Sequence, residues 1–89
     1  MRGLERKYEV RRVSDNAEVD DGFVLRVLKD PAGWMAAWYY ASLTRNEQLR
    51  REMREWLRSN VPTEATLGTE GSANRDLLMD IQRVLAEAA

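Results

Sequence analysis

The second half of the chain contains four arginines whose spacing suits contact with an anionic partner: Arg50, Arg51, Arg54 and Arg58. If this segment is a helix, the arginines lie roughly opposite the apolar residues Leu49, Met53 and Trp56 and form a solvent-facing stripe. Such a stripe, together with Arg11 and Arg12, would contact the phosphates of a nucleic acid. These six arginines are therefore the candidate residues for nucleic-acid binding.

The same arginines also have a simpler interpretation. Glu47 and Glu55 interrupt the stripe, and each stands four residues from Arg51. Opposite charges at this spacing stabilise a helix without any ligand. The formal net charge of −1 is nearly balanced, whereas a dedicated nucleic-acid-binding protein is usually basic. Nucleic-acid binding is thus the secondary functional hypothesis.

The composition removes most catalytic chemistry. The chain has no histidine and no cysteine, which excludes imidazole acid–base catalysis, thiolate nucleophiles and Cys/His zinc sites. The run GTEGSAN at 68–74 lacks the lysine and the preceding strand of a phosphate-binding loop. The acidic residues between positions 15 and 21 do not have the spacing of a calcium loop. We therefore expect no catalytic residue, no metal and no cofactor.

The longest uncharged stretch, at 31–44, is rich in aromatic residues: Trp34, Trp38, Tyr39 and Tyr40. As a helix it has no polar face, and a helix that is apolar all round must be covered all round, which predicts a central core helix. The alternative is that part of its aromatic surface stays exposed and binds a protein, because Trp, Tyr and Arg dominate interface hot spots. The candidate contacts to a partner protein, or to a second copy of this chain, are Trp34, Trp38, Tyr40, Arg50, Arg54 and Arg58.

These side chains need a scaffold, and residues 7–28 predict an antiparallel β-hairpin or small meander. Residues 7–13 alternate between apolar and charged side chains, as in a half-buried strand. Asp15 and Asn16 are turn formers, and the sequence FVLRVL at 23–28 has the β-branched and aromatic composition of a second strand. A short strand around 18–20 is also compatible with the sequence. We expect the apolar face of this hairpin to cover the central helix.

Three helices are expected, over about 31–43, 45–58 and 74–87. Asp30 followed by Pro31 is a strong helix start, because the carboxylate can cap the helix and proline suits its first position. Thr44 and Glu47 match a capping box, which predicts a second helix that begins at Arg45.

The segment 59–73 separates the second and third expected helices. It is rich in Thr, Gly, Ser and Pro and has no periodicity, so we expect a mobile loop. Its length for so small a domain suggests either local structure or a binding role. Ser72 or Asn74 is expected to cap the last helix, which places its apolar residues along one stripe.

The expected architecture is a single α+β domain over residues 1–89, with a small antiparallel sheet packed on three helices. The uncharged stretch of 14 residues is too short to span a bilayer, and the N-terminal residues lack the apolar region of a signal peptide. We expect a cytoplasmic protein without a membrane partner.

Two stretches together form a further pattern: KYEVRRVSDNAEVDDGFVLRVLKDPA and YASLTRNEQLRREMREWL. The pattern resembles that of small uncharacterised proteins of phages and prophages, which combine a K-Y-E/V-R strand, F-V-L-R, a K-D-P-A helix start and Y-A followed by T-x-N, L and W-L. The matching positions are Lys7, Tyr8, Val10, Phe23, Val24, Leu25, Arg26, Lys29, Asp30, Pro31, Ala32, Tyr40, Ala41, Thr44, Asn46, Leu49, Trp56 and Leu57. Val27 and Leu28 depart from the pattern, which has a proline nearby. The resemblance covers about the first two-thirds of the chain and implies a mobile-element origin.

The sequence and this resemblance together predict a small non-catalytic protein-interaction module. Small non-enzymatic proteins of mobile elements often inhibit or redirect a host protein, so we expect an inhibitor or adaptor of such a protein, including one of a host defence system. The alternative is a nucleic-acid-binding regulator that uses the arginine stripe. Either protein could act as a homodimer.

Overall fold

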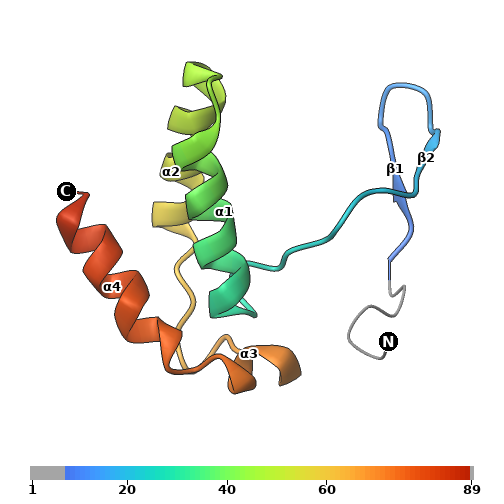
Figure 1. The fold of residues 1–89 in the computed structure, drawn as a ribbon. Helices are drawn as coiled ribbons and strands as arrows, with labels where there is room; N and C mark the ends of the chain where they lie inside the picture. The colour runs from blue at the N-terminus through green and yellow to red at the C-terminus, as the bar shows by residue number, and fades with distance from the viewer. Residues whose placement is uncertain (1–7, 89) are drawn as a thin grey trace.

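The computed structural model describes residues 8–88, and they form a two-stranded antiparallel sheet and four helices (Figure 1). The elements in chain order are β1 (Val10–Arg11), β2 (Glu18–Val19), α1 (Pro31–Leu43), α2 (Glu47–Ser59), α3 (Thr69–Ala73) and α4 (Leu77–Glu87). The expected α+β class is therefore confirmed.

The hairpin is short and is closed by the expected turn. Val10 pairs with Val19, and Arg11 pairs with Glu18. Asn16 has a φ of 58°, a left-handed conformation that asparagine adopts more readily than most residues. One carboxylate oxygen of Asp15 accepts a hydrogen bond from the backbone N–H of Ala17, which stabilises the reversal of the chain.

The predicted strand at 23–28 is not formed, and the strand that pairs with β1 is the short one expected around 18–20. β2 ends at Val19, and the chain then runs away from the hairpin to α1, with a turn at 27–29. Figure 1 shows the hairpin set apart from the helices, so its apolar face does not cover α1 as expected. Only Val27 of this run enters the core, while Phe23 and Leu25 are exposed. A β-prone sequence forms a strand only where another strand supplies hydrogen bonds, and none lies beside it in residues 8–88.

α1 has the bounds that the sequence predicts. Asp30 caps it by accepting a hydrogen bond of 3.0 Å from the N–H of Ala32, and Pro31 occupies the first turn. α2 and α4 lie along α1 and bury one side of it. The core consists of Val27, Trp34, Ala37, Trp38, Ala41, Leu57 and Ile81.

The connection between α1 and α2 differs from the predicted capping box. Asn46 is the N-cap of α2, and its side-chain oxygen accepts a 3.0 Å hydrogen bond from the N–H of Leu49. Thr44 instead accepts a hydrogen bond from the N–H of Asn46 inside the connection. α2 therefore begins at Glu47 rather than at Arg45, because asparagine is a stronger N-cap than threonine.

The segment expected as a mobile loop contains α3, which packs beneath the start of α1. The N–H of Gly68 donates a hydrogen bond of 3.0 Å to the carbonyl of Lys29. The side-chain amide of Asn74 donates to the carboxylate of Asp30, also at 3.0 Å. Neither Ser72 nor Asn74 caps α4, whose N-cap position is taken by Asp76 without a side-chain hydrogen bond.

Candidate protein-interaction surface

Two stacked indole rings form the centre of the fold. Trp34 is fully buried, and its Nε1–H donates a 3.0 Å hydrogen bond to the carbonyl of Leu57 in α2. Trp38 stacks on Trp34 with ring centroids 5.2 Å apart and an angle of 11° between the ring planes. Only 8% of Trp38 is exposed. Both indoles belong to the core, so Trp34 offers no surface to a partner in this structure, and Trp38 offers only its small exposed part.

The arginines of α2 extend this stack. The guanidinium carbons of Arg54 and Arg58 lie 5.1 and 5.5 Å from the centroid of the Trp38 ring, a distance typical of cation–π contacts. Arg54 also donates a hydrogen bond to the hydroxyl of Ser42. Arg58 donates to the carbonyl of Ala88, next to the end of α4. Both arginines therefore join α2 to the other helices.

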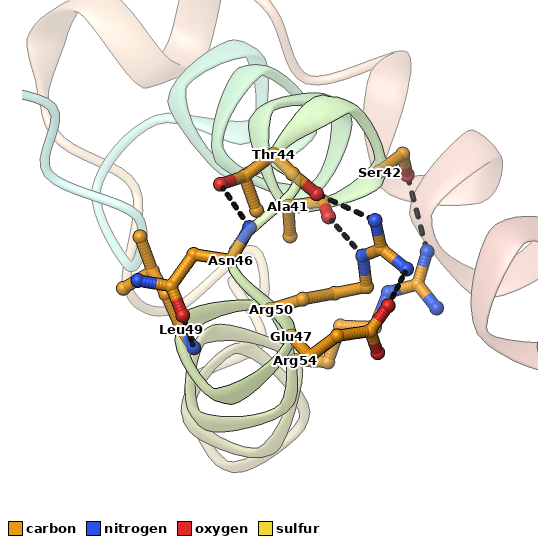
Figure 2. A network of polar contacts seen from close by, with 8 residues as sticks. All are labelled: Ala41, Ser42, Thr44, Asn46, Glu47, Leu49, Arg50 and Arg54. Carbon is orange, nitrogen blue, oxygen red and sulfur yellow. Dashed lines mark hydrogen bonds and ion pairs between the residues drawn. The ribbon is translucent and has the colours of Figure 1, made fainter.

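Arg50 holds the end of α1 (Figure 2). Its Nε–H donates a 3.1 Å hydrogen bond to the carbonyl of Ala41, and Nη2 donates to the carbonyl of Thr44. Glu47 lies 3.5 Å from Nη1 and balances the charge. The last carbonyls of a helix have no hydrogen-bond donor within the helix and carry a partial negative charge. A guanidinium beside them supplies both the donors and the opposite charge.

The expected solvent-facing arginine stripe is therefore not present as predicted. Its members at i, i+4 and i+8, namely Arg50, Arg54 and Arg58, contact α1 and the end of α4. Arg51 is exposed on another side of α2. Arg11 and Arg12 lie on the separate hairpin, where they pair with Glu9 and Asp15. The structure does not bring the six arginines together on one surface.

The side of α1 that the other helices leave uncovered carries a row of uncharged residues. We call this row the α1 ridge: Ala36, Tyr39, Tyr40 and Leu43. The exposed fractions are 65% for Tyr39, 55% for Tyr40 and 62% for Leu43. No residue of α1 is charged. The ridge is thus an apolar, aromatic surface at the end of α1 that Arg50 fixes.

Sequence reasoning found part of this surface. Tyr40 was predicted as a contact residue and is exposed in the structure. Tyr39 belonged to the aromatic stretch, but Ala36 and Leu43 had no sign of exposure in their residue types. Their positions carried a usable signal, because Ala36 and Leu43 lie on the face of a helical wheel opposite Trp34 and Ala41.

An open hollow lies beside the ridge, between α1 and α4. Its volume is about 380 Å³, and Met35 and Tyr39 of α1 line it together with Val84 of α4. Trp38 presents its small exposed part there. An apolar side chain of a partner that contacted Tyr39 would have room to enter this hollow.

The remaining described residues offer little other chemistry. Within residues 8–88, no three acidic side chains lie close enough together to hold a metal ion. None of the helices in that range is long and apolar enough to cross a membrane. No family model matches the chain, and neither a curated protein nor a solved structure matches it.

Proposed function

We propose that this protein is a non-catalytic protein-interaction module whose α1 ridge inserts into an apolar groove of another protein. The observation that carries the proposal is the exposure of Tyr39, Tyr40 and Leu43 on a helix without a single charged residue. With Ala36, these residues stand at i, i+3, i+4 and i+7, which is the spacing of anchors in helix-in-groove recognition.

The size of the ridge favours a groove over a flat partner surface. An aromatic side chain such as tyrosine has about 150–250 Å² of surface that can be buried. The exposed parts of Tyr39, Tyr40 and Leu43 therefore have a combined area of roughly 300 Å². That is within the range of functional patches on monomers but well below the roughly 800 Å² per partner of a standard interface. A groove that encloses the ridge and reaches the hollow beside Tyr39 would supply the difference.

The arginines of α2 contribute to this function indirectly. Arg50 holds the carbonyls at the end of α1, and Arg54 holds Ser42 (Figure 2). Tyr39, Tyr40 and Leu43 project from this fixed part of the helix. A ridge that is already ordered loses less conformational entropy when it binds, and binding is correspondingly tighter.

The resemblance to phage and prophage proteins extends the proposal to a class of partner. On that basis the groove belongs to a host protein, and this protein inhibits or redirects it. Host defence proteins are included in this class.

The test compares two double-lysine variants in capture from a bacterial lysate, followed by titration of the purified captured protein. Tyr40→Lys with Leu43→Lys should lower the affinity at least 100-fold, because hot-spot residues each contribute about 2 kcal/mol or more. Arg51→Lys with Met79→Lys is the control, since both of these residues are exposed away from the ridge.

The salt dependence of binding separates the proposal from a phosphate-binding function. Binding through the ridge should persist in about 0.5 M salt, because salt screens charge–charge interactions but does not weaken apolar association. A capture that both variants retain equally, or one that moderate salt abolishes, would contradict the proposal.

A further inference from the structure

The segment 20–26, which joins the hairpin to α1, has the composition of a strand, but no strand among the described residues pairs with it. Phe23, Val24 and Leu25 are aromatic, β-branched and aliphatic residues that favour pleated structure. Among residues 8–88, no backbone hydrogen bond involves the N–H or C=O of these three residues. Figure 1 shows this part of the chain crossing the space between the hairpin and α1. Within the described residues, the backbone donors and acceptors of Phe23, Val24 and Leu25 are therefore free for another strand, whereas the carbonyl of Arg26 accepts hydrogen bonds from the N–H groups of Lys29 and Asp30.

The side chains of this segment are also unusually exposed. Phe23 is 73% exposed, and Val24 and Leu25 are exposed by about two-fifths of their surface. Stable monomers normally protect a free apolar strand edge with charges, proline or a covering element. The segment is nevertheless held in place at one end, because Val27 is buried in the core and Leu25 lies against Gly33 of α1.

The charges around Phe23 indicate which strand would pair with it. Asp20 stands three residues before Phe23, and Arg26 stands three residues after it. Neither side chain has an ion pair within the described part of the chain. An antiparallel copy of the same segment centred on Phe23 would place each aspartate opposite the arginine of the other copy. A parallel copy would place like charges together, which is unfavourable.

We propose that residues 20–26 pair antiparallel with the same residues of a second copy of this chain, with a two-fold axis at Phe23. The two copies form two ion pairs between Asp20 and Arg26 and one contact between the two Phe23 rings. Directly opposite aromatic and oppositely charged residues are the pairs that stabilise an antiparallel ladder. The arrangement is closed and self-complementary, so it ends at a dimer. It uses a different surface from the α1 ridge and does not depend on the function proposed for that ridge.

The first test is disulfide trapping, for which this chain is well suited because it contains no cysteine. Residues directly opposite across an antiparallel ladder have Cα atoms about 4.5–5.5 Å apart, which a disulfide can bridge. Phe23→Cys should therefore give a covalent dimer on mild oxidation. Val13→Cys is the matched control, since Val13 is fully exposed in the hairpin turn. Equal trapping of both variants would overturn the proposal.

The second test is charge exchange, measured by sedimentation equilibrium of the unmodified full chain and its variants. Asp20→Arg should weaken dimerisation about tenfold, because both ion pairs become like-charge pairs. Asp20→Arg combined with Arg26→Asp should restore the wild-type dissociation constant. A wild-type chain that stays monomeric at all accessible concentrations, or a double variant as weak as the single one, would overturn the proposal.

The ridge variant Tyr40→Lys with Leu43→Lys separates this inference from the proposed function. It should dimerise as the wild type does, since neither residue belongs to segment 20–26. Loss of dimerisation in this variant, with Asp20→Arg unaffected, would assign self-association to α1 and overturn the strand-pairing proposal.

Discussion

Arg50 and Arg51 are neighbours in the sequence of α2, but they have different roles in the structure. Arg50 is partly buried and donates hydrogen bonds to the carbonyls of Ala41 and Thr44. Arg51 is exposed, and the structure shows no hydrogen bond or ion pair for it among the described residues. One position along a helix rotates a side chain by about 100°, which is enough to move it from a helix contact to solvent.

Replacing Arg50 and Arg51 one at a time should distinguish the arginine that stabilises the end of α1 from the one that is only exposed to solvent. Arg50→Ala should lower the free energy of unfolding by about 1.5–3 kcal/mol, because hydrogen bonds from a charged group are lost and the end of α1 is left unsatisfied. Arg51→Ala should change it by less than about 0.5 kcal/mol. Urea unfolding followed by circular dichroism measures both, and equal effects would contradict the capping role of Arg50.

Among the helices, α3 has the least space for an added side chain, at Gly71. A Cβ atom on Gly71 would lie 1.8 Å from the carbonyl oxygen of Lys29, so α3 can pack beneath α1 only with glycine there. Gly33, in α1, has more space: a Cβ there would be 3.7 Å from Leu25, an ordinary contact. The two glycines therefore differ in what they contribute, although both lie within helices.

Alanine substitutions at these two glycines should have opposite signs. Gly71→Ala should destabilise the protein by about 1–3 kcal/mol, because the collision with backbone outweighs the better helix propensity of alanine. Gly33→Ala should stabilise it by up to about 1 kcal/mol, since propensity acts there without a collision. Thermal and urea unfolding give both values. A stabilised Gly71→Ala variant would show that α3 does not pack against Lys29.

The whole molecule exposes more surface than a compact domain of its length. Its radius of gyration is 14.3 Å, against about 12 Å expected for 89 residues. Its accessible surface is 6983 Å², against roughly 5,400 Å² expected from its mass. The hairpin stands apart from the helices and contributes to this open shape (Figure 1).

This open shape predicts uneven stability across the molecule. The amide of Arg12, which donates to the carbonyl of Ala17 in the hairpin, should exchange at least about 100-fold faster than that of Trp38 in the core. An isolated two-stranded hairpin is marginal in water, whereas α1 opens only when the helical core unfolds. Native-state hydrogen exchange in a dilute, monomeric sample measures the two amides. Similar protection would mean that the hairpin and the helices unfold as one unit.

Local sequence signals determined the elements that depend on few neighbours. Asp30 and Pro31 set the start of α1. Its uncharged composition correctly predicted a core helix, but not that one side of this helix would stay uncovered. Asp15 and Asn16 set the hairpin turn. These features depend on backbone preferences and on caps within a few residues, which are visible in the sequence itself.

Only the tertiary structure decided which surfaces remain free. The arginines at 50, 54 and 58 looked like a solvent-facing stripe, yet α1 and the end of α4 lie against them. The strand expected at 23–28 is not formed because no third strand lies beside it within residues 8–88. The exposure of Tyr39 and Leu43 follows from α2 and α4 covering only one side of α1. A side chain's surroundings depend on residues distant in the chain, and composition and periodicity alone do not determine those contacts.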